Sequence, residues 1–225
     1  MTQPSLNPGE ILRTAFNRVG PVFVPVALLA LPANVLPLLM PNPALTATFS
    51  IVFAILIGPI LGGASILLVD RALSGEKMDI GTALSMAWQR AGQLILTSLL
   101  LLVILIPSFA LLLIPGIYLS VRLFAAQYEV MLERKSPTEA MEVSWALTKN
   151  RWWQIFVPIL VITLVFLVPI MLVSAIFANA PLGERITALV GISATPVLLL
   201  AILLIYKGLK GQSVSGSEDT DPLNA

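Results

Sequence analysis

Long apolar stretches alternate with short polar segments along this chain. An α-helix needs about 20 apolar residues to cross the roughly 30 Å hydrocarbon core of a bilayer. The runs of about that length lie at residues 21–40, 47–69, 91–112, 115–132, 152–178 and 187–206. The pattern predicts an all-α integral membrane protein with six transmembrane helices.

The links between these runs group the six expected spans into three hairpins. "PNPAL" joins the first two spans and "NAPLGER" joins the last two, and both are typical turn sequences. Between spans three and four we expect the reversal at Pro115–Gly116, because proline is well tolerated in the first turn of a helix. Pro107 is the alternative position for a break or a kink.

The polar segments that precede the three hairpins share a pattern. "NPGEILRTAFNRVG" begins at Asn7, "DIGTALSMAWQRAG" at Asp79 and "SPTEAMEVSWALTK" at Ser136. Each begins with a helix-capping residue and places an aromatic side chain nine residues later, and Ser136 with Glu139 fits a capping box. Apolar residues at helical spacing complete the pattern of a short amphipathic helix. We therefore predict three repeats of one unit, an amphipathic interfacial helix followed by a transmembrane hairpin.

The predicted repeats form a single membrane domain over residues 1–210. The repeat units cover about 7–70, 79–133 and 136–207. The remaining segment, 211–225, is small, polar and acidic, and we expect it to be a disordered tail.

Basic residues indicate the orientation in the membrane. Of the 13 Lys and Arg residues, 11 flank the spans at the ends opposite the hairpin turns, whereas Arg185 lies at a turn and Arg122 lies inside a span. Because positive charges favour the cytoplasmic side, we expect both termini in the cytoplasm.

Composition narrows the chemistry further. The chain is 57% hydrophobic and 11% charged, with a mean hydropathy of +0.94, and it contains neither cysteine nor histidine. Thiol nucleophiles, histidine bases and Cys/His metal sites are therefore excluded. We predict no catalytic residues, no cofactor and no metal site, and hence no enzyme. The net charge of +1 gives no indication of nucleic-acid binding.

Aromatic residues at the predicted membrane surface are the candidate interfacial anchors. They are Phe16, Trp88, Trp145, Trp152 and Trp153. Tryptophan favours the headgroup level of a bilayer. The short helices have three interpretations: they orient the following span, they lie in the lipid interface, or they dock a partner.

The segment Leu111–Phe156 resembles a group of bacterial membrane proteins, the membrane domain of glycerophosphoryl diester phosphodiesterases and the related YciC-like uncharacterised proteins. The shared elements are Ile114-Pro115-Gly116, Tyr118, Arg122, Glu133, Ala140, Ser144-Trp145 and Trp152-Trp153. The resemblance implies a helical multi-pass membrane fold located in the bacterial cytoplasmic (inner) membrane, and it carries over no catalytic residues. Members named as phosphodiesterases have a separate catalytic domain, which we do not expect here.

Arg122 is the charge deepest inside a predicted span, roughly 10 Å from its start at 1.5 Å per residue. Such residues usually face protein or water. Glu129, Gln127 and Asp70 are its candidate partners. The site has two interpretations, a structural anchor or a contact to an anion or lipid phosphate.

Gly58, Gly62 and Gly63 form a small-residue pattern in the second span. Such residues allow close helix packing in lipid, and we favour packing within one chain over dimerisation.

We interpret the chain as a non-catalytic membrane protein that organises lipids or partner proteins through its cytoplasmic-face helices. The alternative is a transporter or channel for a small or lipidic solute, which would use the inter-repeat interface and Arg122. Expected partners are membrane lipids, with a homo-oligomer or a membrane-protein partner left open, and no nucleic acid.

Overall fold

The computed structural model of the protein describes residues 7–40, 42–177 and 183–218, and within these ranges all regular structure is helical. The elements are α1 (Pro8–Arg18), α2 (Gly20–Val35), the 3-10 helix η1 (Leu36–Leu39), α3 (Pro43–Leu56), α4 (Gly58–Leu73), α5 (Ile80–Trp88), α6 (Ala91–Leu111), α7 (Leu113–Leu123), α8 (Ala126–Leu132), α9 (Pro137–Leu147), α10 (Trp152–Ile176) and α11 (Gly183–Glu218).

The described residues contain the helices of a multi-pass membrane protein. Four segments are long and apolar enough to cross a bilayer: Gly20–Leu39, Ala91–Leu111, Trp152–Ile176 and Arg185–Gly211. A fifth is present if α3 and α4, which meet at a bend of 50° around Ile57, form one broken span. The structure therefore supports four or five spans.

The expected fourth span, 115–132, is not one continuous helix. It is divided into α7 and α8 by a break at residues 124–125, so α7 has only 11 residues. At 1.5 Å per residue α7 is about 16 Å long, roughly half of a hydrocarbon core. Hydrophobicity alone predicted a span here, and a later part of the chain contacts the break.

The reversal before α7 also differs from the expected position. The chain turns at Leu112, whose backbone is extended with φ −158°, and both Pro115 and Gly116 lie inside α7. Gly116 packs against the ring of Phe109 in α6 so closely that an added Cβ would overlap the ring. A glycine is needed here for the close approach of α6 and α7, and the turn itself lies three to four residues earlier. Pro107 lies within α6.

The helices α1, α5 and α9, which we call the three short helices, begin directly after the predicted capping residues. Asn7 accepts a hydrogen bond from the N–H of Gly9, and Asp79 accepts from those of Gly81 and Thr82. Ser136 occupies the N-cap position but makes no side-chain cap hydrogen bond, so the predicted capping box is absent from α9.

The three short helices are buried in the same register. Each has buried residues four and eight positions after its cap: Ile11 and Ala15, Ala83 and Ala87, Ala140 and Ser144. Each exposes the aromatic residue at the next position, with Phe16 54%, Trp88 68% and Trp145 40% exposed. The aligned sequence positions thus share the same order of burial and exposure.

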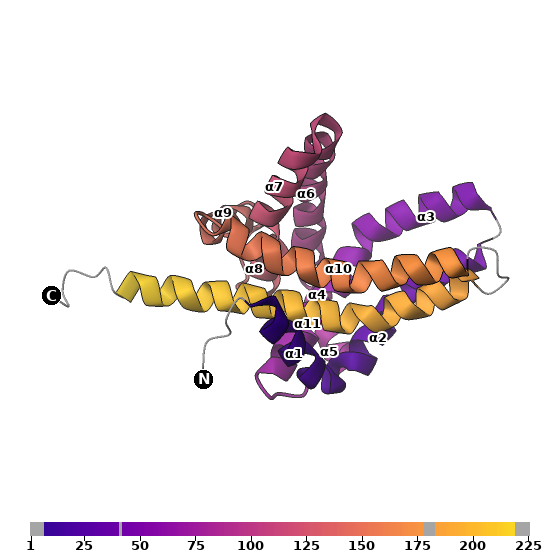
Figure 1. Ribbon diagram of the computed structural model, residues 1–225, viewed down its shortest axis with the longest axis horizontal. Coiled ribbons are helices and arrows are strands. Elements are labelled where there is room, and N and C mark those ends of the chain that lie inside the picture. The colour runs from indigo at the N-terminus through magenta and orange to yellow at the C-terminus, as the bar shows by residue number, and fades with distance from the viewer. Residues whose placement is uncertain (1–6, 41, 178–182, 219–225) are drawn as a thin grey trace.

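Two helices form the centre of the core. α4 contacts α2, α3, α5, α6, α8 and α11, and α11 also contacts α1, α2, α9 and α10. Side chains such as Val69 of α4 and Leu200 of α11 are buried there. In Figure 1 the α6–α7 pair and the α10–α11 pair leave this centre in different directions.

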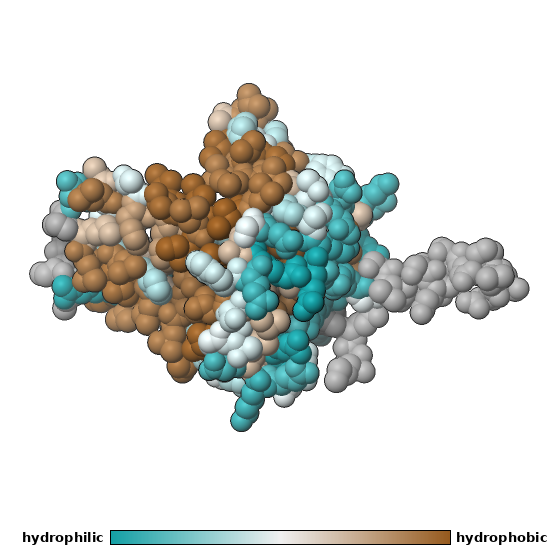
Figure 2. All heavy atoms as spheres, turned by 180° about the vertical axis from the view of Figure 1, so that it is seen from behind, coloured by the Kyte–Doolittle hydropathy of each residue, from teal (hydrophilic) through white to brown (hydrophobic). Residues whose placement is uncertain are grey.

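Charged residues gather at one end of the molecule. We call this end the polar base; it consists of α1, α5, α8, α9 and the ends of α4 and α11 that carry Asp70 and Lys207. On the face that Figure 2 shows, hydrophilic residues gather on one side and hydrophobic residues cover the rest, including the projecting helices. In Figure 1 the start of α1 and the C-terminal end of α11 lie on the same side of the molecule.

The C-terminal segment differs in part from the expected disorder. α11 continues through residues 211–218 and ends at Glu218, whereas 219–225 lie outside the described residues. Extending an existing helix adds one hydrogen bond for each residue that is fixed, so a polar sequence can continue the helix.

Candidate functional site

The break between α7 and α8 is bridged by a side chain of α9. The hydroxyl of Ser144 accepts a hydrogen bond from the N–H of Ala125 at 3.1 Å and donates to the carbonyl of Arg122 at 2.9 Å. Ser144 is fully buried. Because buried backbone groups need partners, this hydroxyl replaces hydrogen bonds that a continuous helix would supply.

Arg122 is held by the same helix. Its guanidinium donates to the carbonyl of Trp145 and to the hydroxyl of Thr148, both at 3.2 Å, and it lies 4.2 Å from the centre of the Trp145 ring. Arg122 and Thr148 are buried. The charge is thus stabilised by a cation–π contact and by oxygen acceptors of α9.

Aromatic side chains surround this contact between α7 and α9. Tyr118 packs edge-on against Trp145 with ring centroids 6.3 Å apart, and it stacks on Trp152 at 6.0 Å. The indole N–H of Trp152 donates to the carbonyl of Tyr118 at 3.3 Å. Five of the residues that carried the family resemblance therefore form one cluster: Tyr118, Arg122, Ser144, Trp145 and Trp152.

The structure does not bring Arg122 to its expected partners. Asp70 pairs with Lys207 at 2.6 Å, and the amide of Gln127 donates to the hydroxyl of Ser98 at 3.1 Å. Glu129 lies on α8, beyond the break at residues 124–125, and its carboxylate contacts other residues.

Glu129 is the centre of a second polar cluster. Its carboxylate accepts a hydrogen bond from the hydroxyl of Tyr206 at 2.9 Å, and Lys135 and Lys210 each lie 3.4 Å from one of its oxygens. Lys210 also pairs with Glu133 at 2.6 Å. Glu129 is fully buried, so this cluster fixes α8 against α11. Sequence reasoning missed it because Tyr206 lies 77 residues away and no local pattern links the two.

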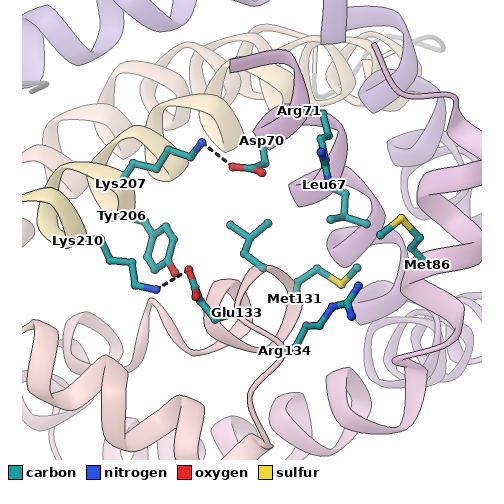
Figure 3. Close-up of a pocket in the computed structure, with 11 residues that line it drawn as sticks. Leu67, Asp70, Arg71, Met86, Met131, Glu133, Arg134, Tyr206, Lys207 and Lys210 are labelled. Atoms are coloured by element: carbon teal, nitrogen blue, oxygen red, sulfur yellow. Dashed lines mark ion pairs between the residues drawn. The ribbon is translucent and has the colours of Figure 1, made fainter. Parts of the chain in front are cut away.

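A cavity of about 310 Å³ opens beside this cluster (Figure 3). It is lined by Leu67, Asp70, Arg71, Met86, Met131, Leu132, Glu133, Arg134, Tyr206, Lys207 and Lys210. Four cations face two carboxylates, and the remaining side chains are mostly apolar. The site can therefore hold a small amphiphilic molecule with negative charge.

Other predicted site residues lie apart from the cavity. Trp153, on α10, is 69% exposed. Phe16 of α1 stacks on Phe166 of α10 with ring centroids 6.3 Å apart. Gly63 packs against Leu94 of α6, where an added Cβ would lie 2.8 Å from a Leu94 methyl carbon. Gly58 and Gly62 make no comparable contact to another helix in the described part of the chain.

No known family model matches this chain, and neither a curated protein nor a solved structure matches it. The resemblance to the phosphodiesterase membrane domain therefore stays a prediction. What the protein does has to be inferred from the geometry of its own residues.

Proposed function

We propose that this chain is a non-catalytic multi-pass protein of the bacterial cytoplasmic membrane that organises lipids at the cytoplasmic surface through its three short helices. In this orientation the polar base and both termini face the cytoplasm, in keeping with the distribution of Lys and Arg. The three units act as repeats, each presenting one surface helix.

The common register of the three short helices carries this proposal. Each helix is fixed by two buried positions and leaves its aromatic side chain, Phe16, Trp88 or Trp145, substantially exposed. Large exposed aromatic side chains next to transmembrane helices favour the headgroup region, where one part of the ring is apolar and the edge is hydrated. Partner proteins that bind the same faces are the alternative occupants.

The geometry of Arg122 favours this function over transport. A solute path would require an accessible polar group within the membrane, whereas the guanidinium is buried and engaged by α9. A second cavity lies beside Phe53. Arg122 lines neither this cavity nor the one at the polar base. We therefore assign Arg122 a positioning role in holding α9.

Site-directed spin labelling tests the proposal directly, because the chain has no native cysteine. Single cysteines replace Phe16, Trp88 or Trp145, and matched controls replace the exposed residues six positions earlier, Glu10, Thr82 and Glu139. The labelled full-length protein is reconstituted in vesicles, and the collision rates of each nitroxide with oxygen and with a water-soluble nickel chelate are measured.

We expect labels at the aromatic positions to report the headgroup level, with greater access to oxygen than to nickel. Labels at the control positions should be accessible to nickel. If the aromatic positions are as accessible to nickel as their controls, the three short helices do not contact lipid and the proposal fails.

A further inference from the structure

The cavity at the polar base has more positive than negative charge around it. Its lining contains Arg71, Arg134, Lys207 and Lys210 against Asp70 and Glu133, a net charge of +2. Four further charges lie next to this set, and they cancel. Glu76 pairs with Arg71, and Glu129 pairs with Lys135 and Lys210, while Lys135 and Arg90 are the two added cations. The excess of +2 therefore remains.

The unpaired positive charge in the lining lies on Arg134. Lys207 and Lys210 are each 2.6 Å from a carboxylate, and Arg71 pairs with Glu76, whereas Arg134 pairs with no carboxylate in the described part of the chain. Figure 3 shows Arg71 and Arg134 on the side of the cavity opposite the two lysine ion pairs. Arg134 thus gives this side of the cavity a positive charge that no side chain in the described ranges neutralises.

Two features of these arginines are unfavourable without a ligand. The Nε of Arg71 is buried and has no hydrogen-bond partner in the described part of the chain. The pKa of Arg90 is lowered by partial burial and by the nearby charge of Arg134. An anion in the cavity would offset each of these.

The size and lining of the cavity narrow the chemistry of that anion. A volume of about 310 Å³ is at the lower end of the range for small-molecule sites and much larger than an inorganic ion requires. Leu67, Met86, Met131 and Leu132 supply an apolar surface beside the cations. A phosphate monoester carries about −1.5 to −2 charge at pH 7, which matches the excess of +2.

We propose that the cavity between α4, α5, α8 and α11 binds an organic phosphate, with Arg71 and Arg134 contacting the phosphate and the leucine and methionine side chains contacting its carbon substituent. The source of the phosphate is either the headgroup of an anionic lipid or a soluble ester. This site includes none of the exposed aromatic residues, so it does not depend on the function proposed above.

Binding is measured on the full-length protein in a neutral maltoside detergent by isothermal titration calorimetry. The probes are inorganic phosphate, propyl phosphate, dihexanoyl phosphatidic acid and dihexanoyl phosphatidylcholine. Binding of phosphatidic acid without propyl phosphate assigns the site to a lipid headgroup, and binding of both assigns it to phosphate esters in general. Absence of binding by either ester, or equal binding of phosphatidylcholine and phosphatidic acid, overturns the proposal.

Substitutions locate the site. Because a charge-assisted hydrogen bond contributes more than a neutral one, Arg134→Gln and Arg71→Gln should each weaken phosphatidic acid binding about tenfold or more. The matched control is Arg13→Gln, which removes an exposed arginine of α1 outside the cavity. A loss for Arg13→Gln as large as that for Arg134→Gln would show nonspecific attraction and refute the site.

Chemical footprinting of the unsubstituted protein gives a readout that does not depend on how the variants fold. Phenylglyoxal modifies accessible arginine side chains, and mass spectrometry reports the extent at each position. Phosphatidic acid should protect Arg134 and leave Arg13 unprotected. Equal modification of Arg134 with and without the lipid would contradict the proposal.

Discussion

The hydroxyl of Ser144 gives the sharpest test of how the break between α7 and α8 is stabilised. In Ser144→Ala the buried N–H of Ala125 loses the acceptor that lies 3.1 Å away. The carbonyl of Arg122 loses a donor at 2.9 Å but keeps the hydroxyl of Thr148 at 3.4 Å. An unpartnered buried polar group costs about 1–3 kcal/mol. We therefore expect Ser144→Ala to lower the free energy of unfolding by about 1–3 kcal/mol.

The assay is reversible unfolding of the purified protein by titration with sodium dodecyl sulfate in mixed micelles, followed by tryptophan fluorescence. The matched control is Ser120→Ala on α7, whose hydroxyl donates only to the carbonyl of Gly116, one turn earlier in its own helix. That variant should change the free energy of unfolding by less than about 0.5 kcal/mol. If the two variants are equally stable, Ser144 does not hold the break and the reasoning is wrong.

Three further substitutions test the packing of the core by the same unfolding titration. Gly63→Ala should destabilise the protein by about 1–3 kcal/mol because its new Cβ would meet a side chain of α6 at 2.8 Å. Gly62→Ala, with open space around it, should be neutral or slightly stabilising, and equal effects of the two variants would contradict this packing. Glu129→Leu should cost about 1–3 kcal/mol because it leaves the buried hydroxyl of Tyr206 without its acceptor, whereas Lys210 keeps its pair with Glu133. Glu129→Gln should cost less because it keeps an acceptor for the tyrosine, and a fully stable Leu variant would refute this reasoning. Arg122→Lys should lower the free energy of unfolding by about 1–2 kcal/mol, because a lysine cannot keep both the contact to the Trp145 ring and the two oxygen contacts. It should also change the near-ultraviolet circular dichroism, and an unchanged spectrum would count against the cation–π contact.

Local sequence patterns were sufficient to locate the starts of the three short helices. Asn7, Asp79 and Ser136 each stand directly before a helix, as predicted, because a polar residue followed by helix-forming sequence is a local signal. The long apolar runs that became α2, α6 and α10 were also recognisable, since hydrophobicity over about 20 residues is a property of the run itself.

The interior polar contacts could not be predicted in this way. Each joins residues far apart in the sequence: Arg122 to Thr148, Glu129 to Tyr206 and Asp70 to Lys207. The sequence offered Glu129 as a partner of Arg122 in a span that was expected to be one continuous helix. The span is interrupted, and a serine from another helix satisfies the backbone groups at the break. Likewise, the cavity is formed by residues from four separate helices, so its excess of positive charge cannot be predicted from any one segment of the sequence.

The bridge from Ser144 also places the formation of this break in time. The hydroxyl that satisfies Ala125 belongs to a residue 19 positions later in the chain. At a synthesis rate of about 5–20 residues per second, that residue is added roughly 1–4 s after Ala125. During this interval the hydroxyl that partners the N–H of Ala125 is not yet part of the chain. The bridge across the break can therefore form only after α9 has been synthesised.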